Sequence, residues 1–297
     1  MILQIGKLIR QLRKQQGMTQ TTLGSGMMSK AEMSRIENGS REPDIFTLNA
    51  LLHRLGKSLE YFEVVISKVE YERLKELEQC TDLEKGLPLK TVVILESELI
   101  KDIRQAKGWS QEQLSEDVCA RETISTIETG RRALSSKKMK QLLEKLDEPM
   151  EKYYGFVVAQ EFEVYEMVHR YQGMEGSEPA AEELLQIIEE RIDMNISWNR
   201  QFIESSRILA KLRKGNMEVA EGLAALDKCL RYTMPEFDGV IYRIPHRQEA
   251  VILETMLDCL KKLGQEETAK DLEQNFFKKI GKKLKVSQNV TAFLIKV

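Results

Sequence analysis

Basic and small polar residues fall on one face of a short helix predicted between Ser29 and Asn38. Met33 and Ile36 are one turn apart and should point inward, so the outward face carries Lys30, Ala31, Ser34 and Arg35. Lysine and arginine suit guanine O6 and N7 or a phosphate oxygen, and an alanine methyl suits a thymine methyl. The pattern predicts contact with double-stranded DNA. The alternative is that Lys30 and Arg35 are ordinary solvated charges.

Other predicted helices must hold this face in place. Residues 5–16 have an amphipathic pattern, and Thr19 is placed to cap a second helix that begins at Gln20 and runs through Met27. Ser29 and Glu32 form a capping box for the third helix, and a fourth runs from Pro43-Asp44 to Leu55. Gln20 lies at a helix N-terminus, where an amide donor suits a phosphate oxygen. Two helices at this spacing present the second one to a major groove.

The chain matches itself without a gap when it is shifted by 91 positions. Matched pairs include Arg13/Arg104, Gly17/Gly108, Gln20/Gln111, Leu23/Leu114, Ser34/Ser125, Ile36/Ile127, Glu37/Glu128, Gly39/Gly130 and Arg41/Arg132. Shared helical periodicity would align apolar residues but not glycine, glutamine, arginine and glutamate in one register. Residues of roughly 5–75 and 96–166 are therefore a duplicated unit.

Both copies resemble the helix-turn-helix of the phage-repressor and Cro superfamily, in GMTQTTLGSGMMSKAEMSRIENGSREPD and GWSQEQLSEDVCARETISTIETGRRAL. Each turn is one residue shorter than usual, which is similar to the PlcR/Rgg group of peptide-responsive bacterial regulators. The resemblance implies that Asn38 and Arg41 touch backbone phosphate. It also implies a partly buried ion pair between Arg13 and Glu37, repeated as Arg104–Glu128.

The second copy departs from the pattern. Its predicted DNA-binding residues are Gln111, Arg121, Glu122, Ser125, Thr126 and Arg132. Thr126 stands where the first copy has Arg35, and Ala120 stands where Ser29 caps the helix. Arg131 and Arg132 add positive charge after the helix. DNA contact by this copy is left open.

The segments that follow the first helix-turn-helix carry strand signals. LEYFEVVI, which begins at Leu59, is rich in β-branched and aromatic residues, and TVVIL at 91–95 is placed to pair with it. Between them, CTDLEKGLP carries Gly86 and Pro88 and is typical of a linker.

Helical periodicity continues through the C-terminal third. The candidate helices are residues 179–192, 196–213, 217–232, 247–263 and 266–284. Pairs of helices around a glycine turn are similar to tetratricopeptide-like hairpins, although no strict 34-residue consensus repeats. The PlcR/Rgg resemblance implies a signalling peptide on the concave face. The nearest candidates for peptide contact are Asn195, Asn199, Arg200 and Arg207, and the alternative is that they are solvated helix residues.

Composition and charge favour a globular, cytoplasmic protein. Of 297 residues, 42% are hydrophobic and 31% are charged, with a net charge of −2. Residues 1–57 hold nine Lys/Arg and four Asp/Glu, residues 92–147 hold ten of each, and the remainder sums to −7. A basic N-terminal end on an otherwise acidic chain is the asymmetry expected when one face meets phosphate. No signal peptide or membrane span is expected.

Catalytic and metal motifs are not found. The four cysteines are scattered and are predicted to be free thiols, and His53, His169 and His246 are isolated in sequence. No phosphate-binding loop, nucleophile elbow or metal-ligand spacing occurs, so we expect neither enzyme, metal nor cofactor.

The predicted architecture is all-α with short strands in the linkers. The expected parts are a first helix-turn-helix (1–57), a linker (58–95), a second helix-turn-helix (96–147), a connector (148–177) and a helical hairpin region (178–297). We predict a sequence-specific, homodimeric transcription regulator, controlled by a peptide or partner on the helical region. One alternative is a protein-interaction module. In that case the helical region binds a partner protein, and the helix-turn-helix units mainly dock that partner. Another is that the helical region only dimerises.

Overall fold

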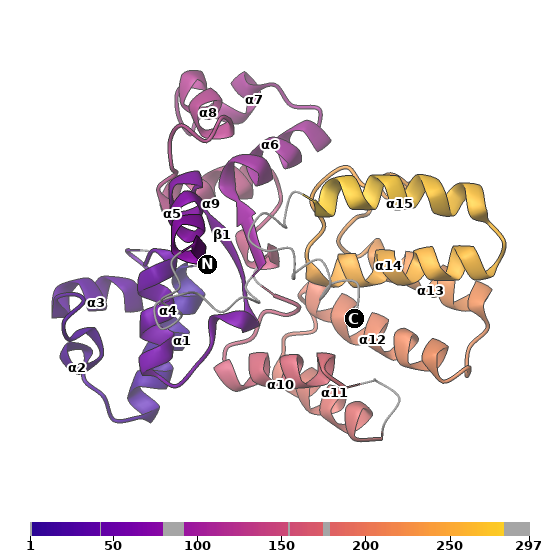
Figure 1. The fold of residues 1–297 in the computed structure, drawn as a ribbon, viewed down its shortest axis with the longest axis horizontal. Coiled ribbons are helices and arrows are strands. Elements are labelled where there is room, and N and C mark those ends of the chain that lie inside the picture. Colours follow the sequence, from indigo (N-terminus) through magenta and orange to yellow (C-terminus); the bar gives the residue numbers. More distant parts are fainter. Residues whose placement is uncertain (1, 42, 80–91, 154, 175–178, 282–297) are drawn as a thin grey trace.

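The computed structural model describes residues 2–41, 43–79, 92–153, 155–174 and 179–281. Within these residues the fold is almost entirely helical, and two helix-turn-helix units project from different corners of the molecule (Figure 1). The predicted linker at residues 80–88, including Cys80, lies outside the described residues.

The first unit contains α1 (Ile2–Gln15), α2 (Gln20–Gly24), α3 (Lys30–Glu37), α4 (Ile45–Arg54) and the 3₁₀ turn η1 (Leu59–Tyr61). The second contains α6 (Glu96–Ala106), α7 (Gln111–Ser115), α8 (Arg121–Glu128), α9 (Ser136–Lys145) and η2 (Met150–Tyr153). Four helices in each unit match the prediction. The second helix of the first unit is shorter than predicted, because the chain turns at Ser25 instead of continuing to Met27.

The predicted strands form a parallel pair. Strand β1 (Glu63–Ile66) pairs with β2 (Val92–Leu95), with Val65 opposite Ile94 and Ile66 opposite Leu95. Successive side chains of a strand point to opposite faces. Val65 and Ile94 accordingly pack in the core of the second unit, whereas Ile66 and Leu95 pack in the core of the first. The two strands therefore join the two units.

Two helices were not expected from the sequence. Helix α5 (Lys68–Gln79) follows β1, and α10 (Phe162–Gln172) follows η2 at nearly the equivalent place in the repeat. The repeated unit thus has a helix after its 3₁₀ turn. The core of the first unit continues into α10 and α11 (Pro179–Arg191), so the predicted connector is part of a packed core.

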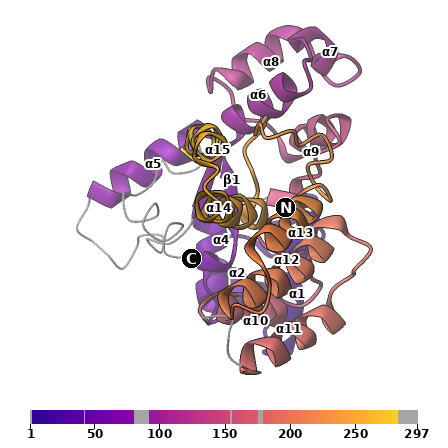
Figure 2. The ribbon, with the colours of Figure 1, turned by 90° about the vertical axis from the view of Figure 1, so that its right-hand side faces the viewer.

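The remaining helices are α12 (Ser197–Arg213), α13 (Val219–Leu230), α14 (Arg247–Lys262) and α15 (Glu266–Ile280). Their bounds lie within a few residues of the predicted ones, except that 282–284 fall outside the described residues. Consecutive helices stack as neighbours and enclose a separate core, as the two ribbon views show (Figures 1 and 2).

Candidate nucleic-acid interface

Helix α3 begins with the predicted capping box. The Ser29 hydroxyl accepts a hydrogen bond from the Glu32 backbone N–H at 3.2 Å, and the Glu32 carboxylate accepts one from the Ser29 N–H at 3.0 Å. Met33 and Ile36 are buried in the core. Lys30, Ala31 and Arg35 are consequently exposed, with Ser34 half-buried beside them, as the sequence predicted.

A buried ion pair fixes α3 against α1. The Arg13 guanidinium donates to both carboxylate oxygens of Glu37, at 2.5 and 2.9 Å, and to the Met18 carbonyl at 2.7 Å. Burial raises the pKa of Glu37, but hydrogen bonds from Arg13 and Gln20 outweigh it and the pKa is lowered overall. The predicted Arg13–Glu37 pair is confirmed, and it holds the recognition helix in one orientation.

Gln20 has a different partner from the predicted one. Its amide nitrogen donates to Glu37 at 2.8 Å, so the side chain belongs to a triad with Arg13. The amide has a second N–H, for which contact with phosphate stays a prediction. The sequence missed this role because 17 residues separate Gln20 from Glu37.

Asn38 and Arg41 are exposed after α3. The Asn38 side-chain oxygen accepts hydrogen bonds from the Ser40 backbone and hydroxyl, and Arg41 pairs with Glu32. The Arg41 side chain is still 52% exposed. An exposed ion pair of this kind is weak, so Arg41 remains available to a phosphate.

The second unit repeats the triad. Arg104 donates to Glu128 at 2.6 and 3.0 Å, and the Gln111 amide donates to Glu128 at 2.9 Å. The predicted Arg104–Glu128 pair is confirmed. Gln111, like Gln20, is engaged within the protein.

The outer face of the second unit differs. Arg121, Glu122 and Arg132 are exposed, whereas Ser125 and Thr126 are half-buried. The Thr126 hydroxyl donates its hydrogen to the Thr123 carbonyl of the same helix, at 2.8 Å. Helix α8 has no side-chain cap at Ala120.

The second unit has exposed carboxylates at four positions where the first unit has neutral residues. The first unit has the neutral residues Thr21, Ser25, Gly26 and Ala31, and the second unit places exposed carboxylates at the same positions: Glu112, Glu116, Asp117 and Glu122. Carboxylates oppose the approach of phosphate. The first unit therefore presents the more favourable DNA-binding surface.

The predicted effector residues do not form one binding surface. Asn199 is fully buried: its side chain bonds to the Val158 N–H at 2.7 Å and to the Val158 carbonyl at 3.0 Å. The prediction for Asn199 is wrong, because its polar atoms hold the segment before α10 against α12. A sequence pattern does not distinguish a buried amide of this kind from an exposed one.

The other three residues bond to neighbouring side chains. Arg207 forms a bidentate pair with Glu189, at 3.2 and 2.5 Å, which ties α12 to α11. The Asn195 amide donates to Asp193, and the Arg200 guanidinium lies over the Tyr232 ring. None of the three lines the groove among α13, α14 and α15 or the cavity beside the second unit.

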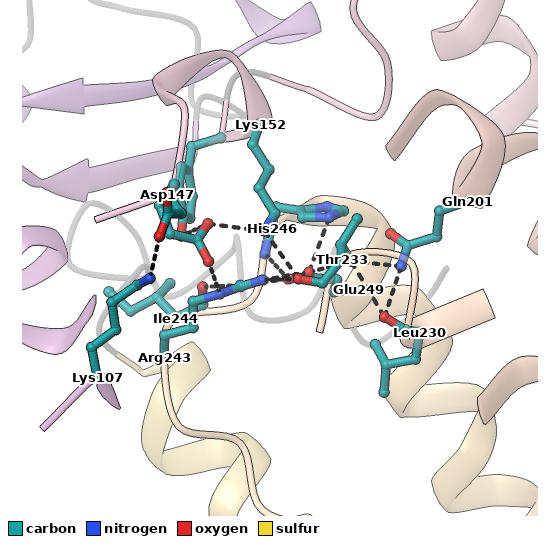
Figure 3. Close-up of polar contacts among 12 residues, drawn as sticks. Lys107, Asp147, Lys152, Gln201, Leu230, Thr233, Arg243, Ile244, His246 and Glu249 are labelled. Carbon is teal, nitrogen blue, oxygen red and sulfur yellow. Dashed lines mark hydrogen bonds and ion pairs between the residues drawn. The ribbon is translucent and has the colours of Figure 1, made fainter. Parts of the chain in front are cut away.

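A buried polar cluster, unexpected from the sequence, joins the second unit to the C-terminal helices (Figure 3). Arg243 bonds to Glu249 at 2.7 and 2.8 Å and to Glu148 at 2.6 Å, and Lys152 pairs with Glu148 at 2.9 Å. The His246 Nε2 atom lies 3.2 Å from the Glu249 Oε1 atom. These five residues, from Glu148 to Glu249, are spread over a hundred positions of the chain, so no local motif marks them.

The environment of the cluster shifts its pKa values. Burial lowers the pKa of His246 despite the Glu249 carboxylate, and burial together with the Arg243 charge lowers that of Lys152. Burial would raise the pKa of Glu249, but the Arg243 charge holds it well below its usual range. The cluster has two cations, two carboxylates and a neutral histidine, so its net charge is zero.

Two further features bear on function. Across the described ranges, no three His, Cys, Asp or Glu side chains come together in a way that would hold a metal ion. No described helix is both long and apolar enough to span a bilayer.

Known structures resemble the whole chain only distantly. PlcR of Bacillus thuringiensis, in complex with the peptide PapR7 and DNA, is 13% identical, with 99% of this chain and 100% of that chain covered and a TM-score of 0.26. The apo form of ComR from S. thermophilus is 16% identical, with coverage of 100% and 99% and a TM-score of 0.25. A mutant of PrgX is 15% identical, with coverage of 98% and 99% and a TM-score of 0.21. These TM-scores are too low to establish a common arrangement of the whole chains.

No curated protein matches the chain. The helix-turn-helix family model, by contrast, matches twice, over residues 9–62 and 100–153. These segments are the two units described above, each with its arginine–glutamate–glutamine triad. The two units belong to the helix-turn-helix family of DNA-binding regulators, in the phage-repressor and Cro type, and the chain carries them in tandem.

Proposed function

We propose that the protein is a sequence-specific transcription regulator that inserts α3 into the major groove of DNA. The observation that supports this most directly is the exposed Lys30, Ala31 and Arg35 face on a helix that a capping box and a buried ion pair hold rigid. A rigid helix loses little conformational freedom on binding, so its contacts contribute more fully to affinity.

We further propose that the first unit supplies most of the affinity. Its segment 1–57 has a charge of +5, whereas residues 92–147 are neutral. Phosphate contacts dominate affinity, so the difference in charge acts directly on binding. Four exposed carboxylates in the second unit act against such contacts.

The test is selection of bound sites from a random DNA pool with the full chain, at about 150 mM salt, followed by titration of the selected site. Lys30→Ala with Arg35→Ala should weaken binding at least tenfold, because a good base contact contributes about 1–3 kcal/mol. The matched control is Arg121→Ala with Thr126→Ala, which should have a much smaller effect.

Equal affinity of the first double variant and the wild type would contradict the assignment of the recognition face. If no DNA were selected at all, the protein-interaction module would be the better function. A larger loss from the Arg121 and Thr126 variant would reverse the assignment of the two units.

A second proposal concerns control by an effector. A groove of about 1020 Å³ lies among α13, α14 and α15, with apolar walls such as Leu223 and Met256 and side-chain amides at Gln274 and Asn275. Amide side chains suit the backbone of an extended peptide. We propose this groove, in place of the predicted Asn195, Asn199, Arg200 and Arg207, for a short peptide or a partner segment.

The oligomeric state decides between the effector and the dimerisation proposals. We expect a homodimer formed by the C-terminal helices, with the groove left open. In sedimentation equilibrium, Ala224→Arg in the groove should leave the dimer intact if the groove is an effector site. Dissociation of this variant into monomers would show that the groove is the dimer interface.

A further inference from the structure

The two helix-turn-helix units meet the rest of the protein through equivalent junctions. In the first, Tyr61 stacks edge-on against Phe162 and His169, with ring centroids 5.6 and 5.1 Å apart. Phe62 stacks against Tyr165 at 4.9 Å. Aromatic rings therefore occupy the contact between η1 and α10.

The second junction uses the same positions of the repeat differently. Lys152 and Tyr153 stand where the first unit has Tyr61 and Phe62. The segment between α13 and α14 covers them, and a cavity of about 550 Å³ remains. Its walls come from the second unit, from α12 and from that segment, with apolar residues that include Ile103, Trp198, Met234, Phe237 and Val240.

Apart from the exposed Glu236, the charged side chains at the cavity have partners of opposite charge. Lys107 pairs with Asp147 at 2.9 Å, Lys152 pairs with Glu148, and Arg243 is shared by Glu148 and Glu249. A charged ligand would either break one of the buried pairs made by Glu148 and Arg243 or add an unbalanced charge next to them, and both are costly. The buried pairs therefore disfavour an ionic ligand beside them.

We propose that this junction cavity binds a neutral, mainly apolar small molecule. The volume lies within the range of about 300–1,000 Å³ typical of small-molecule sites, which are mostly lined by apolar and aromatic side chains. A molecule seated there contacts the second helix-turn-helix unit and the C-terminal helices together. The proposal is independent of DNA binding.

The test uses N-phenyl-1-naphthylamine, a neutral apolar fluorophore, with the full chain. The chain has two tryptophans, so Trp109→Phe leaves Trp198, in the cavity wall, as the only one. The probe should bind saturably at one site and quench Trp198 emission by energy transfer. Ala106→Phe, which fills the cavity beside Ile103, should weaken binding at least tenfold, whereas the matched Ala224→Phe in the α13–α15 groove should not.

Several outcomes would overturn the proposal. These are absence of saturable binding, equal binding by Ala106→Phe and wild type, or tighter binding of the anionic analogue 8-anilinonaphthalene-1-sulfonate than of the neutral probe. Circular dichroism confirms that each variant is folded. If Ala106→Phe does not fold, Val240→Phe fills the same cavity from an exposed position on the covering segment and must give the same loss.

Discussion

The two helix-turn-helix units are alike inside and different outside. Both contain the triad of arginine, glutamate and glutamine that ties three helices together, with bond lengths that agree within about 0.1 Å. The outer face has Lys30 and Arg35 in the first unit, but Arg121 and Thr126 in the second, which also has the four exposed carboxylates. Both units thus have the same interior contacts, while their outer surfaces differ in charge.

The junctions show the same contrast. Aromatic rings fill the contact between the first unit and α10, whereas a polar cluster and a cavity lie between the second unit and the C-terminal helices. At the second junction, the apolar cavity beside the polar cluster leaves space for a small molecule. This contrast agrees with the proposal that the first unit supplies most of the affinity for DNA.

The largest expected effect tests the shared interior. Glu37→Ala and Glu128→Ala should each reduce the free energy of unfolding by about 3–5 kcal/mol, because each leaves an arginine whose side chain is only 11% exposed without its partner. Urea denaturation followed by circular dichroism measures this. If Glu128→Ala reduced the free energy of unfolding much less than Glu37→Ala, the second unit would not depend on its triad.

The second prediction concerns pH at the polar junction. Burial lowers the pKa of His246 in the folded state, so below the ordinary value of about 6.5 the unfolded chain binds a proton that the folded chain does not. Stability should fall as the pH drops through this window, at up to about 1.4 kcal/mol per pH unit. His246→Asn removes the titrating group and retains a residue suited to the helix N-cap.

The measurement is the difference in unfolding free energy between wild type and His246→Asn at pH 7.5, 6.5 and 5.5. Wild type should lose stability relative to the variant as the pH falls. A constant difference would show that His246 binds its proton equally well in both states.

The third prediction uses the caps of the two recognition helices. Ser29→Ala should destabilise the first unit by about 1 kcal/mol, because α3 loses its capping box. Ala120→Ser should stabilise the second unit by a similar amount, since α8 begins without a side-chain cap. Thermal unfolding measures both variants, and the prediction requires that Ser29→Ala lowers the melting temperature and Ala120→Ser raises it. Two changes of the same sign would show that the caps are not comparable.

The smallest effect concerns a turn between the two helices of each motif. Gly26 has a φ of +72°, and its counterpart Asp117 adopts +61°, where a side chain costs energy that glycine avoids. Asp117→Gly should stabilise the second unit by about 0.5 kcal/mol after the greater flexibility of unfolded glycine is subtracted. Gly26→Asp should destabilise the first unit. Stabilisation by Gly26→Asp would show that the turns differ in conformation.

Local patterns were sufficient for much of the fold. The capping box at Ser29, the inward Met33 and Ile36 and the C-terminal helices depend on neighbours within a few positions, and all were predictable. The 91-residue register was predictable because the chain matches itself at that offset. The pair Arg13–Glu37 was predictable because the family resemblance and its repetition in the second unit pointed to it. Helices α5 and α10 were missed because they lie in the segments interpreted as a linker and a connector, although α5 is rich in strong helix formers.

Long-range contacts were decided only by the tertiary structure. Asn199 has the sequence character of an exposed amide, but the segment at Val158 packs over it and takes up its hydrogen bonds. Glu148, Arg243 and Glu249 form one cluster because the segments before η2 and before α14 meet in space. Sequence determined the local helices through short-range hydrogen bonding and periodicity. Burial and charge pairing between distant segments depend on how those helices pack, and only the folded chain establishes them.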